Sequence, residues 1–246
     1  MRNLKLIIEY DGSRYNGWQR LGKGESENTI ENKLLEVIKK MTGEEVELFC
    51  GCRTEVGVHA YAQIANFKTK SDMKLYEIKN YFNRYLPMDI AVVEVEEMPE
   101  RFQAALNAKS KTYLYRIAIG DVPSVFDRKY TYYCFKNPDI ELMKKAAREL
   151  IGKHDFKDFS SVKRSKSTEK EIYTIDIHQD KKEIQITMKA NDFIHNMARM
   201  LCSTLLEIGL GNRKIEEIEK IFDAESMETG SLPANPQGLF LQEIEY

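Results

Sequence analysis

Apolar and polar residues along the first hundred positions follow the order strand, helix, strand, strand, helix, strand. Alternating Ile- and Leu-rich residues from Leu4 to Tyr10 predict a strand that ends at the turn residues Asp11 and Gly12. Apolar residues at helical spacing from 30 to 41 predict an amphipathic helix, with Asn28 and Glu31 at capping-box spacing and Gly43 at its end. The remaining predicted elements are strands at 46–49, 63–67 and 90–95 and a helix at 75–86 that stops before Pro87.

The same order recurs from residue 111. It predicts a strand at 112–119, a helix at 140–151, a hairpin of 172–177 and 184–188, helices at 193–208 and 215–222, and a last strand at 239–244. Gly209 is expected to end the longer helix. This order is typical of ferredoxin-like α+β halves, with an antiparallel sheet and helices on one face. We therefore expect two such halves, residues 1–106 and 107–246, with any shared site in the cleft where they meet.

Composition is that of an ordinary globular protein, with 42% hydrophobic and 31% charged residues. No apolar run is long enough to span a bilayer and no amino-terminal leader is evident, so we expect a cytoplasmic protein. Four scattered cysteines are expected to be reduced thiols. The net charge of −2 gives no support to a nucleic-acid partner. Such a partner would need local patches, and two basic clusters qualify unless they are solvated surface: Lys109, Lys111 and Arg116, and Lys163, Arg164, Lys166 and Lys170.

The predicted loop between the second and third strands concentrates chemical groups in the segment Gly51-Cys52-Arg53-Thr54-Glu55-Val56-Gly57-Val58-His59-Ala60. Loops held by a rigid sheet are where sites are commonly built. The plainer interpretation is a glycine turn whose Arg53 and Glu55 form a surface ion pair. A metal site would need more than Cys50, Cys52 and His59, and no glycine-rich phosphate loop follows a strand. The residue types alone do not decide between a structural turn and a functional site.

This segment resembles the signature Gly-Arg-Thr-Asp-x-Gly-Val-His-Ala of the bacterial tRNA pseudouridine synthase A family. Further segments resemble that family's motifs in the same order along nearly the whole chain. They are Tyr10-Asp11-Gly12 with Gly17-Trp18-Gln19-Arg20, Arg101-Phe102 with Lys111-Thr112-Tyr113-Leu114-Tyr115, Asp155-Phe156 with Phe159, Ala190-Asn191-Asp192-Phe193-Ile194-His195-Asn196-Met197-Ala198-Arg199, and Gln237-Gly238-Leu239-Phe240-Leu241.

The resemblance implies conversion of uridine to pseudouridine in the anticodon arm of tRNA, at family positions 38–40, without a cofactor or metal. It places the catalytic carboxylate at Glu55, its arginine partner at Arg199 and a tyrosine that holds the extruded base at Tyr113. Arg53 would fill the space that the base leaves. The other substrate-binding residues that it suggests are Thr54, His59, Arg20, Lys163, Arg164 and Lys166.

The resemblance also implies a continuous, mainly antiparallel sheet flanked by helices around a central cleft, and a homodimer that binds tRNA. The chain departs from the family at Glu55, where the family has aspartate, at Cys52, which replaces a glycine, and at Val56. A non-catalytic RNA-binding relative is therefore the alternative function. A nucleic-acid hydrolase would differ by cleaving strands or releasing uracil. Trp18 can be a residue that faces RNA or a core anchor, and Tyr113 can be a packed strand residue.

Overall fold

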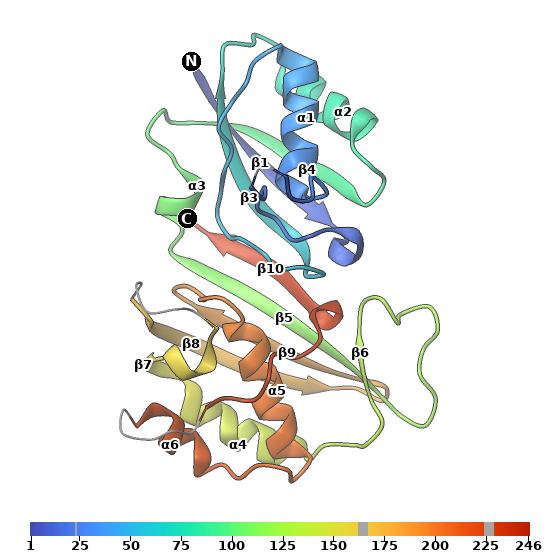
Figure 1. Ribbon diagram of the computed structural model, residues 1–246, viewed down its shortest axis with the longest axis vertical. Helices are drawn as coiled ribbons and strands as arrows, with labels where there is room; N and C mark the ends of the chain where they lie inside the picture. The colour runs from blue at the N-terminus through green and yellow to red at the C-terminus, as the bar shows by residue number, and fades with distance from the viewer. Residues whose placement is uncertain (23, 162–166, 224–228) are drawn as a thin grey trace. The chain divides into compact units, whose positions relative to one another are not determined.

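Helices flank strands that pair mainly antiparallel, which confirms the α+β class (Figure 1). The structure is a computed structural model and describes residues 1–22, 24–161, 167–223 and 229–246. The chain divides into unit 1, residues 1–109 with 240–246, and unit 2, residues 110–239. The predicted halves, 1–106 and 107–246, and the cleft between them stay predictions. No helix in the described ranges is long and apolar enough to cross a membrane.

Unit 1 is built on β1 (Arg2–Tyr10), which pairs antiparallel with both β3 (His59–Thr69) and β4 (Ile90–Met98). The short β2 (Phe49–Cys50) pairs antiparallel with β3 on the edge opposite to β1. The last strand, β10 (Leu239–Glu245), runs parallel to β3 at its beginning. The unit also contains η1 (Gly12–Arg14), α1 (Ile30–Thr42), α2 (Leu75–Tyr85) and α3 (Ala104–Asn107).

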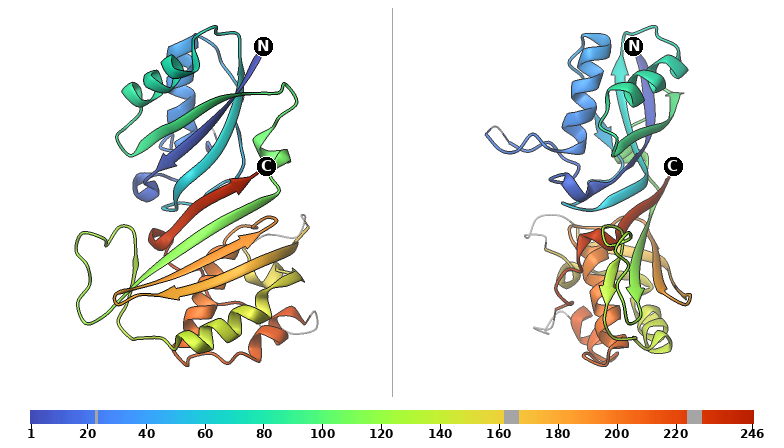
Figure 2. Two further views of the ribbon diagram at one scale, coloured as in Figure 1. Left: turned by 180° about the vertical axis from the view of Figure 1, so that it is seen from behind. Right: turned by 90° about the vertical axis from the view of Figure 1, so that its right-hand side faces the viewer.

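In unit 2, four strands lie in the order β5 (Ser110–Ile119), β9 (Glu183–Ala190), β8 (Glu169–Gln179) and β7 (Gly152–Asp155), all antiparallel. A short β6 (Tyr132–Cys134) runs parallel to β5. The helices α4 (Ile140–Leu150) and α5 (Met197–Gly209) cover one face of these strands, as the front and rear views agree (Figure 2). The other segments are η2 (Lys157–Phe159), α6 (Glu217–Phe222) and η3 (Pro236–Gly238).

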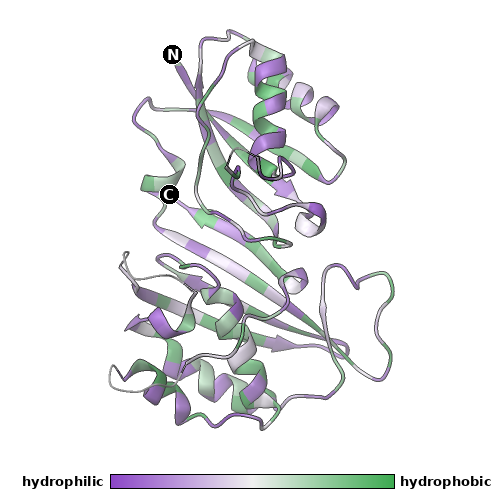
Figure 3. Cartoon of the chain, in the orientation of Figure 1, coloured by the Kyte–Doolittle hydropathy of each residue, from purple (hydrophilic) through white to green (hydrophobic). Residues whose placement is uncertain are grey.

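The apolar residues that the sequence pattern placed on one face of a strand or helix form the cores of the two units. Leu4, Leu6 and Ile8 of β1 are fully buried, while the intervening residues Lys5 and Ile7 are partly exposed, as a half-buried strand requires. Hydropathy alternates in the same way along the strands and around the helices (Figure 3). Each fully buried side chain of this kind contributes about 1.5–3 kcal/mol, so the alternation fixes which face of β1 is inside.

Several predicted boundaries were wrong for reasons that lie outside local periodicity. Thr29, not Asn28, caps α1: its side chain accepts from the Asn32 amide, while Glu31 accepts from the Arg20 amide. The helix predicted from residue 193 begins at 197 because Asn196 has a left-handed φ of 63°, which an α-helix cannot contain. Other changes are small or add short elements: β2 is confined to 49–50, β3 begins at 59, the longer helix includes residue 209, and α3, β6 and β7 were not predicted.

Candidate active site

The loop between β2 and β3, residues 51–58, is held in place by hydrogen bonds from buried polar side chains. Gln63 is fully buried; its amide nitrogen donates to the Cys52 carbonyl at 2.5 Å and its amide oxygen accepts from the Cys52 N–H at 3.3 Å. The hydroxyls of Tyr10 and Thr54 lie 2.6 Å apart, and both residues are buried. Glu55 next along the chain is half-buried and Arg53 is exposed. Buried side chains on either side thus hold the loop that presents Arg53 and Glu55.

The amino-terminal motif packs against the same loop through two glycines. A Cβ at Gly12 would lie 2.0 Å from the Val58 carbonyl oxygen, and one at Gly17 would lie 2.9 Å from that of Thr54. Gly17 also has a left-handed φ of 83°, which favours glycine. The Trp18 N–H donates to the Thr54 carbonyl at 3.0 Å. These residues set the position of the loop backbone, which explains why the motif and the loop occur together.

Trp18 and His59 are part of this packing. Trp18 is 1% exposed and lies beside the Tyr10 ring, so it is a core anchor and does not face RNA. His59 is also 1% exposed, belongs to β3 rather than to the loop, and stacks on Phe240 with ring centroids 4.7 Å apart. Its Nδ1 accepts from the Gly12 N–H at 3.1 Å. The same nitrogen lies 3.2 Å from an Asp11 carboxylate oxygen.

The other predicted substrate-binding residues differ in their exposure to solvent, and some of them are not described by the structure. Thr54 is buried with its hydroxyl against Tyr10. Arg20 is exposed in the loop that leads to α1, where its backbone N–H donates to Glu31 at 2.6 Å. The basic residues expected to contact phosphates, Lys163, Arg164 and Lys166, lie outside the described residues.

In unit 2, Tyr113 of β5 is 5% exposed and meets the edge of Phe193 at 5.1 Å and 87°. The residue before Phe193, Asp192, binds two lysines: Lys111 at 2.5 Å and Lys170 at 3.3 Å. Burial alone would raise the pKa of the Asp192 carboxyl, but the two lysines outweigh it and hold that pKa below its ordinary value. This ion triad fixes the chain beside Phe193 and so helps to place the aromatic pair.

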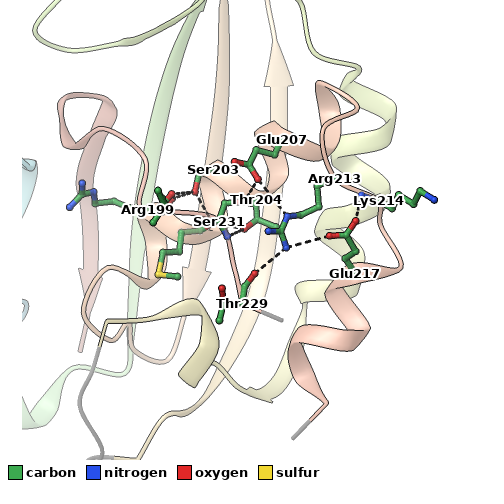
Figure 4. Close-up of polar contacts among 11 residues, drawn as sticks. Arg199, Ser203, Thr204, Glu207, Arg213, Lys214, Glu217, Thr229 and Ser231 are labelled. Carbon is green, nitrogen blue, oxygen red and sulfur yellow. Dashed lines mark hydrogen bonds and ion pairs between the residues drawn. The ribbon is translucent and has the colours of Figure 1, made fainter. Parts of the chain in front are cut away.

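Arg199 lies in the first turn of α5 and is half-buried. Its Nε donates to the Ala234 carbonyl at 2.6 Å and its Nη1 to the Asn196 side-chain oxygen at 3.0 Å. The side chain stands at one end of a row of polar residues on α5 (Figure 4). Two bonds to one guanidinium fix the plane of the group as well as its position.

The structure thus brings Arg53, Thr54, Glu55 and His59 together in unit 1, and it places Tyr113 and Arg199 in unit 2. Sequence reasoning missed the supporting residues Gln63 and Asn196. Gln63 carried one signal, since a polar side chain on a strand must find partners when it is buried. Within the described ranges, no group of three or more His, Cys, Asp or Glu side chains could hold a metal ion.

Comparison with known proteins agrees with this arrangement of motifs. The family model described as tRNA pseudouridine synthase matches residues 6–107 and 146–246. "tRNA pseudouridine synthase A 2" of Bacillus cereus (strain ATCC 10987 / NRS 248) is 41% identical, and "tRNA pseudouridine synthase A 1" of Clostridium tetani (strain Massachusetts / E88) is 43% identical; in both cases all of this chain and all of the relative are covered. "tRNA pseudouridine synthase A 2" of Clostridium perfringens (strain 13 / Type A) is 41% identical with the same coverage. The chain belongs to the tRNA pseudouridine synthase family.

Proposed function

We propose that this isomerase converts uridine to pseudouridine in the anticodon arm of tRNA, at positions 38–40, with Glu55 as its catalytic carboxylate. The observation that carries the proposal is the way the loop is held. Gln63 and Tyr10 fix the segment from Cys52 to Thr54 in a chain that matches its family over its full length. A catalytic group must stay within a fraction of an ångström of its productive position, and buried hydrogen bonds provide that restraint.

The reaction needs no redox partner and no donated group. The bond from ribose C1′ to uracil N1 breaks, the base turns, C5 bonds to C1′, and the proton lost from C5 is balanced by one gained at N1. A carboxylate can attack the substrate or remove a ribose proton, and exclusion of water keeps the detached base from escaping. We assign the role of this carboxylate to Glu55.

The remaining roles follow from side-chain chemistry. Arg199 pairs with the carboxylate and keeps it ionised when RNA covers it; its fixed guanidinium plane suits a two-pronged contact. Tyr113, held edge-on by Phe193, supports the extruded base, which must leave its stack at a cost of a few kcal/mol. Arg53 is exposed, as a residue that replaces the base in the helix must be. Thr54 and His59 are buried, so their contribution to substrate binding is to shape the loop.

The direct experiment measures pseudouridine in tRNA after incubation with the purified protein and no added cofactor. We expect product with the parent and none with Glu55→Ala. The extra methylene of glutamate moves the carboxylate by about 1.5 Å relative to aspartate. A loop adapted to glutamate makes Glu55→Asp slower, whereas an unadapted loop makes it faster. Tight tRNA binding without product from the parent and from Glu55→Asp would refute the enzyme and support a non-catalytic RNA-binding relative; strand cleavage or free uracil would indicate a hydrolase.

The RNA contacts can be tested separately. Replacement of Lys163, Arg164 and Lys166 by alanine should weaken tRNA binding alike for all sequences. It should also flatten the salt dependence by about one phosphate contact for each charge removed. An unchanged salt slope would make these residues ordinary surface.

We also infer that the protein acts in the cytoplasm, where tRNA is found, and as a homodimer that binds tRNA. The dimer proposal rests on the family resemblance. Sedimentation equilibrium tests it, because a monomer has a mass of 28.7 kDa and a dimer has twice that mass.

A further inference from the structure

The segment of residues 229–235, here called the strap, lies along α5 and is bound to it by successive side chains (Figure 4). The Ser203 hydroxyl donates to the Leu232 carbonyl at 2.6 Å, and the Thr204 hydroxyl accepts from the Ser231 N–H at 3.0 Å. One turn further along, the carboxylate of Glu207 accepts from the Ser231 hydroxyl. Three polar residues of one helix therefore hold two neighbouring residues of the strap.

The start of the strap has anchors of its own. Arg213 donates to the Thr229 carbonyl at 3.0 Å and lies 3.5 Å from the Glu207 carboxylate. The Gly230 N–H donates to the Asp158 carbonyl at 2.9 Å, and a Cβ at Gly230 would lie 2.6 Å from the Phe159 ring. The motif Asp155-Phe156-x-x-Phe159 thus has a structural role, since its second phenylalanine packs against the strap.

The same motif also leads to Asn196. Two residues after Phe159, the Ser161 N–H donates to the His195 carbonyl at 3.1 Å, and the Ser161 hydroxyl accepts from the Asn196 side-chain nitrogen at 2.9 Å. The Asn196 side chain is thereby oriented with its oxygen toward Arg199, and its left-handed backbone ends any helix before that point.

Both sets of contacts converge on one guanidinium. The far end of the strap supplies the Ala234 carbonyl to Arg199 Nε, and the Ala234 N–H returns a bond to the Arg199 carbonyl at 3.2 Å. Asn196 supplies the second acceptor. A single hydrogen bond contributes little net stability, so the number of these contacts along a short segment indicates a requirement for position.

We infer that the strap and Asn196 are positioning elements that fix the direction in which Arg199 presents its guanidinium, and that Ser203, Thr204 and Glu207 act on the reaction through them. This inference rests on the proposed role of Arg199 as partner of the catalytic carboxylate. An arginine side chain has many rotamers, and a displacement of about 1 Å at a reacting group can cost about a hundredfold in rate.

Thr204 offers the sharpest test because two replacements separate its shape from its hydroxyl. Thr204→Val keeps the shape of a fully buried side chain and removes the acceptor for the Ser231 N–H, whereas Thr204→Ser keeps the hydroxyl and loses a methyl group. We expect Thr204→Val to lower kcat by between tenfold and a hundredfold. The KM for tRNA should change by less than about twofold, since the substrate-binding residues are untouched. Thr204→Ser should stay near the parent rate, as should the control Thr174→Val, which changes an exposed threonine of β8.

Asn196→Gly is the second variant, because glycine adopts the left-handed conformation without strain and removes only the side chain that binds Arg199. It should lower kcat in the same way, and Asn196→Asp, which retains an acceptor oxygen, should recover part of the rate. Rates are expressed per folded molecule, with the folded fraction taken from thermal unfolding.

The outcomes separate the inference from the function on which it rests. We expect Arg199→Lys, which keeps the charge but loses the two-pronged geometry, to be inactive. If that variant is inactive but Thr204→Val and Asn196→Gly keep the parent kcat per folded molecule, even with a lower Tm, the positioning role is overturned. A rise in KM at unchanged kcat would overturn it equally, because it would assign the strap to tRNA binding. If Arg199→Lys itself reacts at the parent rate, the proposed pairing of Arg199 with the carboxylate is wrong, whatever the strap does.

Discussion

Gly12→Ala tests whether the amino-terminal motif sets the position of the catalytic loop. The added Cβ would stand 2.0 Å from the Val58 carbonyl oxygen and 2.7 Å from its carbon, and both are backbone atoms. Because Cβ contacts below 3.0 Å essentially do not occur, the two segments must separate by about 1 Å. Val58 is three residues after Glu55, and its N–H is bonded to the Glu55 carbonyl at 3.2 Å, so the shift reaches the carboxylate.

The expected result is a fall of roughly a hundredfold in kcat for pseudouridine formation, the usual cost of a displacement of about 1 Å at a catalytic group. Overpacking should also lower the free energy of unfolding by about 1–3 kcal/mol, which corresponds to a Tm lower by about 2–12 °C. The measurements are single-turnover rates on an unmodified tRNA transcript, tRNA affinity by filter binding, and thermal unfolding of both proteins.

Gly22→Ala is the matched control, since it lies in the loop that follows and the nearest atom to its Cβ would be a Glu25 side-chain oxygen at 3.9 Å. It should leave rate, affinity and Tm unchanged. If Gly12→Ala, at equal folded fraction, reacted at the parent rate, the close contact with Val58 would have no bearing on the position of Glu55, and the reasoning would be refuted.

Two further predictions concern buried polar groups. Gln63→Leu removes the hydrogen-bond partners of the buried N–H and C=O groups of Cys52. We expect the free energy of unfolding, measured with urea, to fall by about 2–4 kcal/mol. A Gln63→Leu protein as stable as the parent would show that water replaces the side chain. Asp192 has a lowered pKa, so its contribution to stability is present above the ordinary value of 3.8 and is lost as the pH falls through the folded-state pKa. Asp192→Asn should therefore be less stable than the parent at neutral pH, and the difference should shrink below about pH 4. A difference independent of pH would assign the effect to packing instead of to the charges of Lys111 and Lys170.

Local pattern determined the elements of this protein because burial of a side chain depends first on its spacing along a strand or helix. The alternation in β1 and the helical spacing in α1 gave their faces correctly. The motif around Glu55 likewise stands in sequence order, so its residues could be named as candidates, and the match to known synthases gave the family.

Only the tertiary structure shows which contacts the motif residues between those elements make with one another. Gly12 needs its missing side chain because of Val58, and Gly17 because of Thr54, contacts between residues about forty positions apart. Thr29 rather than Asn28 caps α1 because the adjacent loop takes Glu31 as an acceptor for the Arg20 amide. Arg199 owes its direction to the strap, whose bonds to α5 are made largely by backbone groups. Every residue except proline carries both an N–H and a C=O, so the sequence leaves no mark that shows which of them will meet.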